Sequence, residues 1–313
     1  MKMKLYFNYS LDCELPKNTD YTGPERVPFF NGPATWDAGK DSVRGFVERM
    51  ADLKAAKGTS LFVYPDVARH QKTLFREAAA AGVEIGLHLN GLRYSRLRGE
   101  SAKWLGAMTR AEQLEALRQG KQDVEDAVGR PCLGYRACYG SANDDTFAIL
   151  EELGFFWASN CGSRYRPEFH AKWAGSWRYP HRANRKCKLI PGDLRLYEIP
   201  VTCGLKTLFS TNPDQPLDLR AEASPELVGE KREKLRDVIA ENLDEMDRQE
   251  SPVRAIIGMS HNTNPFRDRR THQSQNLDWV VQYTKALAAK QKLLFTPAPF
   301  ATILTEALRV DAY

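Results

Sequence analysis

The sequence has no long hydrophobic run, and this absence excludes one class of protein. No stretch approaches the roughly 18 consecutive apolar residues that a membrane-spanning helix needs. The N-terminal run MKMK is followed by the strand-like LYFNYSL, without a long apolar core or a small-residue cleavage site. We therefore predict a cytoplasmic protein with no membrane span.

Paired cysteines are also missing. The sequence has six cysteines and no CxxC pair among them. In a cytoplasmic protein this pattern predicts reduced thiols that pack as small hydrophobic residues, and nothing in it indicates a Cys-His nucleophile. The six are Cys13, Cys132, Cys138, Cys161, Cys187 and Cys203.

Acidic residues are scarce in one segment, although the formal net charge of the whole chain is only +5. Residues 161–190 hold many arginines and lysines with aromatic residues between them, and Glu168 is their one acidic counterpart. Such a segment suits an anionic partner or a sugar stacked on aromatic rings, and equally a solvated basic loop. We name Arg178 and Trp177 as candidate substrate-binding residues. Because no nucleic-acid-binding motif accompanies the segment, we predict no nucleic-acid partner.

A glycine-rich phosphate loop is absent, which argues against an open, doubly wound nucleotide-binding sheet. What is present is a steady alternation of strands and helices, typical of a parallel sheet; about seven or eight such units predict a closed barrel. The fold class is therefore α/β, a distorted barrel in a single domain over residues 1–313, with an insertion at about 161–195. The expected strands are 4–11, 60–64, 83–88, 132–136, 155–158, 196–202, 254–259 and 293–296.

Capping signals mark two of the intervening helices. Thr109 and Glu112 form a capping-box pattern ahead of an apolar face. Ser224 followed by Pro225 predicts the start of another helix, which continues through the apolar residues around Leu235. The stretch 203–224, with the sequence STNPDQPLDL, is expected to be a loop.

Polar side chains follow four of the expected strands at the point where each strand ends. In a parallel barrel the active site lies at the carboxyl ends of the strands, so these side chains should meet in one pocket. A carboxylate and an imidazole can hold a divalent cation, a second carboxylate can take a proton from water, and a second histidine can protonate the leaving group. The residues are Asp12, Glu14, His88, Asn90, Arg136, Tyr139 and His261.

These stretches resemble the polysaccharide deacetylase family, the NodB-homology group of carbohydrate esterases. The first, second and third motifs of that family are similar to SLDCE, to EIGLHLN and to YRACYGSANDDTFAILEELGF; its later strands are similar to LYEIPVT and GMSHNT. The resemblance runs in the family's order over roughly residues 5–300. It implies a distorted barrel, usually of seven strands, that hydrolyses the amide bond of an N-acylated sugar.

Carried over residue by residue, the resemblance assigns a role to each strand end. Asp12 is the expected general base, oriented by Arg136, and His261 is the expected general acid. Glu14 and His88 are expected metal ligands, with zinc as the expected metal. Tyr139 belongs to an expected substrate groove.

One departure from the family pattern concerns the metal. The second histidine of the family is replaced, because Leu92 stands four residues after His88 and Asn90 stands two residues after it. We assign the third ligand to Asn90, whose amide oxygen binds zinc less well than imidazole does. His70 lies at the start of a helix below the rim and is a poor substitute.

The sequence therefore predicts a metal-dependent hydrolase that removes an N-acyl group, most simply acetyl, from an intracellular and anionic sugar or glycan precursor. Two alternatives stay open. One is an amidohydrolase of a non-sugar carbon–nitrogen bond, and the other is a non-catalytic carbohydrate-binding relative with a decayed metal site.

Overall fold

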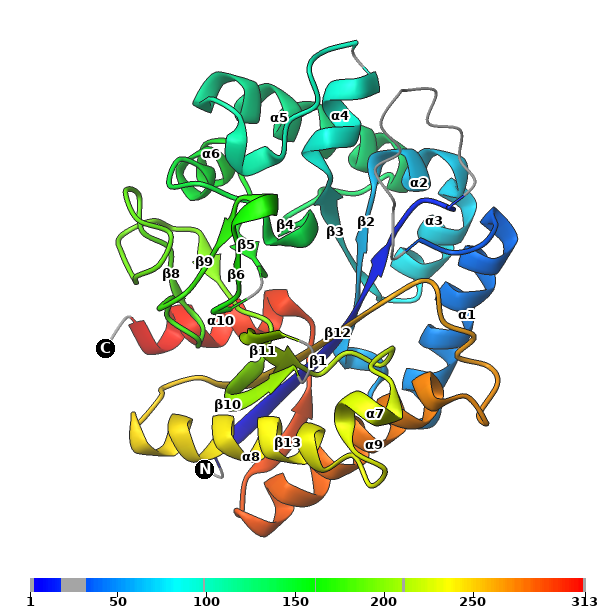
Figure 1. Cartoon of the computed structure of the whole chain (residues 1–313), viewed down its shortest axis with the longest axis vertical. Coiled ribbons are helices and arrows are strands. Elements are labelled where there is room, and N and C mark those ends of the chain that lie inside the picture. The colour runs from blue at the N-terminus through cyan, green and yellow to red at the C-terminus, as the bar shows by residue number, and fades with distance from the viewer. Residues whose placement is uncertain (1–2, 18–31, 98, 161, 210–211, 312–313) are drawn as a thin grey trace.

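The structure, a computed structural model, describes residues 3–17, 32–97, 99–160, 162–209 and 212–311 (Figure 1). Within these residues one sheet has the strand order β12-β1-β2-β3-β4-β5-β9-β8, and β13 pairs with β1. All pairs in it are parallel except β8 with β9. The strands are β1 (Lys4–Cys13), β2 (Thr59–Val63), β3 (Glu84–Leu89), β4 (Gly134–Ala137), β5 (Trp157–Ala158), β8 (His181–Arg182), β9 (Tyr197–Glu198), β12 (Arg254–His261) and β13 (Leu294–Pro297).

Helices surround the curled sheet, so the architecture is the predicted distorted barrel (Figure 1). The α-helices are α1 (Trp36–Asp52), α2 (Pro65–His70), α3 (Lys72–Ala80), α4 (Gly91–Leu97), α5 (Arg110–Val128), α6 (Thr146–Glu152), α7 (Pro225–Val228), α8 (Glu233–Arg248), α9 (His272–Lys290) and α10 (Phe300–Asp311). None of the helices in the described part of the chain is long and apolar enough to cross a membrane.

The alternation of side chains along β1 separates the packing face from the catalytic face. Every second residue from Leu5 to Cys13 is buried in the large core that the outer helices cover. The residues between them face the other way, because successive side chains of a strand point to opposite faces. That inner face begins with the aromatic ring of Tyr6, and it ends at the carboxylate of Asp12. The barrel is thus apolar at one end and polar at the other.

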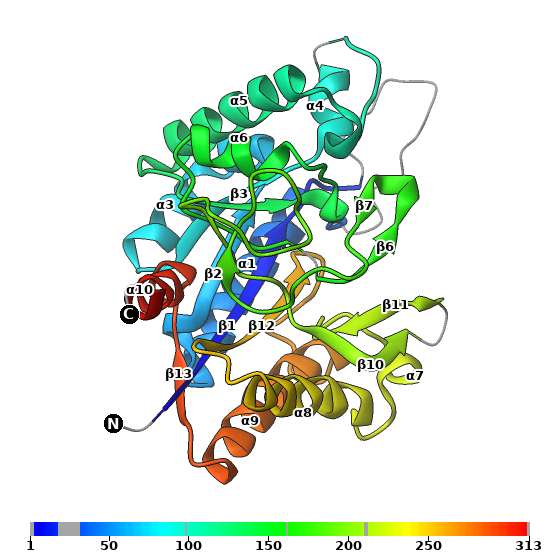
Figure 2. The same cartoon turned by 90° about the vertical axis from the view of Figure 1, so that its left-hand side faces the viewer.

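An aromatic cluster fills the amino-terminal end of the barrel. The ring of Trp157 stacks on Phe300 of α10 at a centroid distance of 4.6 Å and meets Phe62 edge-on at 5.5 Å. The guanidinium of Arg136 lies 3.9 Å from the centroid of the Phe62 ring. Helix α10 lies across this end of the sheet (Figure 2). The cluster therefore supports the polar rim from below.

We expect Gly134→Ala to destabilise the protein, because a methyl group there would overlap the indole ring of Trp157. Overpacking of this kind costs about 1–3 kcal/mol. Urea denaturation followed by circular dichroism would measure the loss. In the double variant with Trp157→Phe, the smaller ring should restore part of it. An unchanged denaturation midpoint in Gly134→Ala would contradict this account of the cluster.

The eight expected strands are all present, with ends shifted by a few residues. The eighth expected strand, β13, does not pair with the seventh, β12. It pairs instead with Lys4–Phe7 at the start of β1, and β2 pairs with the later residues of β1 along the same edge. The capping box of Thr109 and Glu112 is confirmed at the start of α5.

Two local predictions were wrong. The stretch 203–224 is not simply a loop, since it contains an antiparallel pair of strands, β10 (Cys203–Phe209) and β11 (Asn212–Asp218). The helix expected from Ser224 stops after one turn as α7, and α8 begins separately after Arg232, whose φ of 60° interrupts the helical path.

The predicted insertion adds little regular structure. It contains β6 (Tyr165–Arg166), which pairs with β7 (Ala171–Lys172), and also β8. In Figure 2 the pairs β6–β7 and β10–β11 both lie toward the end of the barrel where β1 and β12 finish. Cys161 of this insertion lies outside the described residues; the five described cysteines form no disulfide.

Candidate active site

One pocket at the carboxyl ends of the strands brings together the predicted catalytic residues. It lies between the rim of the barrel and the segments that carry β6 and β11. Every side chain to which we assigned an acid, base or orienting role lines it. The lining residues include Asp12, Glu14, His88, Arg136, Tyr139 and His261.

Asp12 is buried and held by Arg136. Nη1 of Arg136 donates to Oδ1 of Asp12 at 2.8 Å, and the same guanidinium donates to Ser10 and Ser159. Burial raises the pKa of Asp12, but the neighbouring charges, that of Arg136 first, outweigh it, so the pKa lies below its usual value. Asp12 is therefore ionised and oriented, as a general base must be.

Glu14 is fixed through its backbone by Asn262. The backbone N–H of Glu14 donates to Oδ1 of Asn262 at 2.8 Å, and Nδ2 of Asn262 donates to the Glu14 carbonyl at 3.1 Å. The Glu14 side chain is 2% exposed, yet its Oε2 has no hydrogen-bond partner. Burial of a carboxylate oxygen without a partner costs free energy, so a proton donor or a cation beside this atom would stabilise it.

His88 presents one ring nitrogen to both carboxylates. Nδ1 lies 3.0 Å from the carbonyl oxygen of Arg136, which can only accept, so this nitrogen carries the proton of the neutral ring. Nε2 then has a free lone pair, 3.6 Å from Oε1 of Glu14 and 3.8 Å from Oδ2 of Asp12. This is the usual arrangement of a metal-binding histidine, with the other nitrogen held by a backbone carbonyl.

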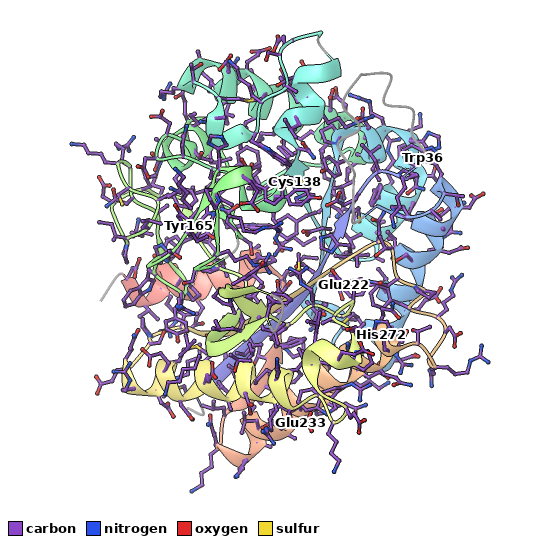
Figure 3. All side chains as sticks on the ribbon, in the orientation of Figure 1. Trp36, Cys138, Tyr165, Glu222, Glu233 and His272 are labelled. Atoms are coloured by element: carbon purple, nitrogen blue, oxygen red, sulfur yellow. The ribbon has the colours of Figure 1, made fainter. Side chains whose placement is uncertain are left out.

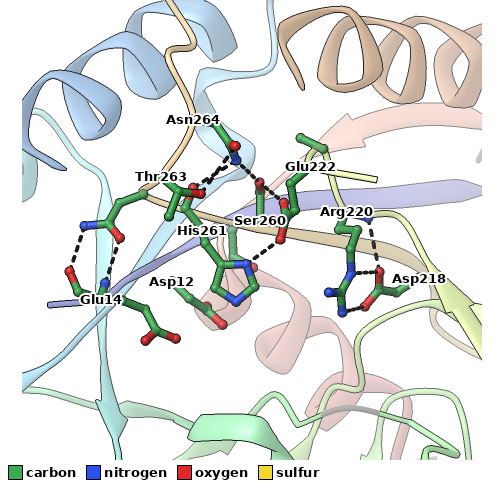
Figure 4. Close-up of polar contacts among 12 residues, drawn as sticks. Asp12, Glu14, Asp218, Arg220, Glu222, Ser260, His261, Thr263 and Asn264 are labelled. Carbon is green, nitrogen blue, oxygen red and sulfur yellow. Dashed lines mark hydrogen bonds and ion pairs between the residues drawn. The ribbon is translucent and has the colours of Figure 1, made fainter. Parts of the chain in front are cut away.

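The general-acid candidate His261 is supported by Glu222, which sequence reasoning missed. Nδ1 of His261 pairs with Oε1 of Glu222, and Ser260 donates to the other oxygen at 2.5 Å (Figure 4). Burial lowers the pKa of His261, but the carboxylate of Glu222 outweighs it, and the net pKa is raised. The same partnership lowers the pKa of Glu222 to about 2. A protonated ring is thus favoured beside the pocket.

A cluster of three possible metal ligands adjoins the pocket, and two of them, Glu14 and His88, line it. The donor atoms of Glu14, His88 and Cys138 all lie within 4.8 Å of one another, and all three residues are buried. Because these atoms are types that divalent metals bind, and because Oε2 of Glu14 lacks a partner, the residues fit a cation.

The other candidate ligands are not part of this cluster, although the side chain of Asn90 lies beside Cys138 and Tyr64. Oδ1 of Asn90 accepts from the backbone N–H of Arg93 at 3.3 Å, in the first turn of α4. Leu92 is buried. His70 stacks on Trp36 with ring centroids 3.8 Å apart and is not among the residues that line the pocket.

The structure does not bring Arg178 and Trp177 to the pocket. Nη1 of Arg178 donates to the carbonyl of Gly204 at 3.0 Å, and Trp177 is 41% exposed. Besides Arg136, the arginines that line the pocket are Arg164, Arg166 and Arg220. The insertion thus reaches the pocket at its beginning, where Arg164 and Arg166 lie, and not at the positions that we predicted.

Arg220 and Glu222 had no sequence signal that sets them apart. Both follow β11, in the part of the chain expected to be a loop. Asp218 holds the first of them, because its two oxygens accept from Nε and Nη2 of Arg220 at 2.7 and 2.8 Å (Figure 4). Arg164 pairs with the same buried carboxylate. Arg164 and Arg220 are therefore joined through Asp218.

The curled parallel barrel and the buried base, acid and ligand cluster at its carboxyl rim define a hydrolase of the NodB-like class. Residues 34–157 match the family model for polysaccharide deacetylase. That span includes His88 and Arg136, whereas Asp12 and His261 lie outside it. This match over less than half of the chain agrees with the family that the motifs predict, and it supports a deacetylase-like hydrolase of carbon–nitrogen bonds.

Solved structures agree with this fold. A putative polysaccharide deacetylase from Mycobacterium smegmatis aligns over 100% of this chain and 92% of its own, with 18% identity and a TM-score of 0.62. A putative glycoside hydrolase/deacetylase from Parabacteroides distasonis aligns over 98% and 72%, with 8% identity and a TM-score of 0.65. The Puue allantoinase aligns over 99% and 92%, with 15% identity and a TM-score of 0.55. No curated protein matches the sequence.

Proposed function

We propose that the protein is a metal-assisted amidohydrolase that removes an N-acyl group, most simply acetyl, from an anionic sugar or glycan precursor. The observation that carries the proposal is the pairing of an ionised carboxylate and a supported imidazole in one pocket. Asp12 is held by Arg136, and His261 is held by Glu222. Amide hydrolysis needs both partners, a base for water and an acid for the departing amine.

The chain's own residues divide the proton transfers between them. Asp12 takes a proton from a water molecule that attacks the acyl carbonyl carbon. His261, protonated on the nitrogen that Glu222 does not hold, donates a proton to the amide nitrogen as the carbon–nitrogen bond breaks. Arg136 keeps Asp12 in its ionised form throughout, and Glu222 stabilises the charged ring before transfer.

Glu14 and His88 are the residues that would hold a divalent cation. The free lone pair of His88 Nε2 and the unpartnered Oε2 of Glu14 support this assignment. When bound, the cation supplies Lewis-acid polarisation of the carbonyl and a lower pKa for water.

The charge of the pocket wall supports an anionic substrate. Arg164 and Arg220 share the single buried carboxylate of Asp218, so this trio keeps one net positive charge. Arg166 lies above the rings of Tyr139 and Phe169, at 5.7 and 4.2 Å from their centroids. Guanidinium groups on a partly enclosed wall suit a carboxylate or a phosphate.

Arg166→Gln is expected to raise KM for an anionic substrate with kcat little changed. Loss of one charge-assisted hydrogen bond, about 1.5–3 kcal/mol, corresponds to roughly a 10–150-fold rise. The dependence of KM on salt should also become weaker. The matched control is Arg178→Gln, which removes an arginine of the same segment outside the pocket. If KM rose only in Arg178→Gln, Arg178 would be the substrate-binding arginine, and the role given to Arg166 would be contradicted.

The test of the proposed function is acetate release from N-acetylglucosamine and from its 1-phosphate, which differ only in the anionic group. Higher kcat/KM for the phosphate supports the proposal. Hydrolysis of neither sugar, with or without added zinc, would contradict an N-acetyl sugar as the substrate class.

Two alternatives remain distinguishable. The likeness in fold to an allantoinase favours adding a cyclic amide such as allantoin to the substrate panel. A protein that binds sugars without hydrolysing any amide would instead be a carbohydrate-binding relative. The cytoplasmic location stays a prediction.

A further inference from the structure

Cys138 is a possible metal ligand that the predicted set of Glu14, His88 and Asn90 did not include. It lies on the short turn after β4, close to the centre of the view in Figure 3. We propose that Cys138, not Asn90, supplies the third protein ligand of the divalent cation, together with Glu14 and His88. This inference rests on the metal-assisted function proposed above, but its test does not depend on turnover.

The spacing of the three donor atoms fits one cation after a small movement of the side chains. They lie within 4.8 Å of one another. A zinc ion binds sulfur at about 2.3 Å and nitrogen at about 2.0–2.1 Å, so at the tetrahedral angle these two ligands are roughly 3.6 Å apart. An approach of about 1 Å, within the reach of side-chain rotation, would complete the geometry.

The contacts within the cluster favour a positive charge between its members. The proton of neutral His88 is on Nδ1, so the lone pair of Nε2 faces the lone pairs of Glu14 Oε1 at 3.6 Å. The second oxygen of Glu14 has no partner although it is buried. A cation among these atoms would satisfy both groups at once.

The backbone after β4 is bent so that Cys138 is buried in the cluster. The next residue, Tyr139, has φ 55° and ψ 10°, a left-handed conformation that residues other than glycine seldom adopt. Cys138 is 1% exposed, and its sulfur lies 2.9 Å from the hydroxyl of Tyr64. Because a metal-bound thiolate accepts hydrogen bonds, Tyr64 would act as the outer partner that orients the ligand.

Asn90 lies beside the cluster, but its acceptor atom is engaged in a helix cap. Oδ1, its only acceptor, accepts the N–H of Arg93 at the first turn of α4, and the side chain also contacts Cys138 and Tyr64. Its amide nitrogen cannot bind a metal, because it has no free lone pair.

A sulfur ligand changes the expected metal. An oxygen–nitrogen–oxygen set from Glu14, His88 and Asn90 would reduce the advantage of zinc over magnesium or manganese. A thiolate is a soft ligand and favours zinc or cobalt over those harder cations. The cluster is therefore a zinc-type site with one carboxylate, one imidazole and one thiolate.

Cobalt titration of the metal-free protein tests the inference without any substrate. A thiolate bound to cobalt gives an intense charge-transfer absorption in the near ultraviolet. We expect this band to saturate at one cobalt per chain and to be lost in Cys138→Ser. Cys132→Ser is the matched control, because Cys132 is also a buried thiol but does not belong to the cluster. Its Sγ donates to the carbonyl of Gly134. The control should keep the band.

Zinc affinity provides a second measurement. Loss of an outer partner already weakens metal binding by roughly 10–100-fold, so loss of the ligand in Cys138→Ala should cost at least that much. Asn90→Ala should leave zinc affinity within a few-fold of the parent. Cobalt bound without a charge-transfer band, or an Asn90→Ala variant that loses zinc while Cys138→Ala keeps it, would overturn the inference.

The outcomes separate this inference from the proposed function. A chain that shows the thiolate–cobalt band but hydrolyses no amide would retain the cysteine ligand and contradict the enzyme. A chain that releases acetate but binds neither cobalt nor zinc would overturn the cysteine ligand and leave the base and the acid in place.

Discussion

Asp12→Asn is expected to abolish acyl release while the fold stays intact. An amide of the same shape can keep an acceptor oxygen toward Nη1 of Arg136, but it cannot take a proton from water. Removal of a general base costs about 10²–10⁴-fold in kcat. Acetate release and the circular dichroism spectrum, measured on the same preparation, would check both parts of this result.

Ser10→Ala is the matched control for Asp12. Ser10 is on the same face of β1, two residues earlier, and accepts from the same Nη1 of Arg136 at 2.7 Å. Its loss removes a partner of the arginine but no proton acceptor, so kcat should fall only a few-fold. If Asp12→Asn retained as much activity as Ser10→Ala, Asp12 would not be the base.

His261→Ala is expected to lower kcat by about 10²–10⁴-fold while the metal stays bound. The ring lies beside Glu222 and Asp12, and it does not belong to the cluster of Glu14, His88 and Cys138 (Figure 4). Metal content, measured on the purified variant, should therefore equal that of the parent. Loss of the metal in His261→Ala would mean that the acid and ligand roles are wrongly divided.

Glu222→Gln tests the same residue through pH. The acid form of His261 is the active one, and the carboxylate of Glu222 raises its pKa. Removing that charge lowers the pKa, so the fall of kcat at alkaline pH should begin at a lower pH than in the parent. A pH profile that does not move would exclude Glu222 as the group that stabilises the protonated ring.

The barrel and most of the pocket could be predicted because both follow from the strands. The carboxyl ends of parallel strands lie on one edge of the sheet, so the polar residues that end the buried strands meet there. Asp12 and His261 are register partners on neighbouring strands, as that arrangement requires. What could be predicted is what the strands themselves determine.

The residues that could not be predicted come from irregular segments. Glu222 follows β11, where neither a helical nor a strand period marks the carboxylate that will face His261. Arg164 and Arg166 were only two of many basic residues in the insertion, and charge alone favoured Arg178 equally. Cys138 has the sequence signal of any buried thiol; only the turn at Tyr139 distinguishes it.

The pairing of β1 with β12 and β13 has a consequence for synthesis of the chain. Glu14 and Asn262 bond to each other across 248 positions, so folding must close a very long loop. Contacts this distant slow folding. While a ribosome is still making residues 254–297, both edges of the strand that carries the base lack some or all of their neighbours. A nascent chain thus leaves a hydrophobic strand partly unpaired until residues 254–297 have been made, and chaperone dependence should be greatest in that interval.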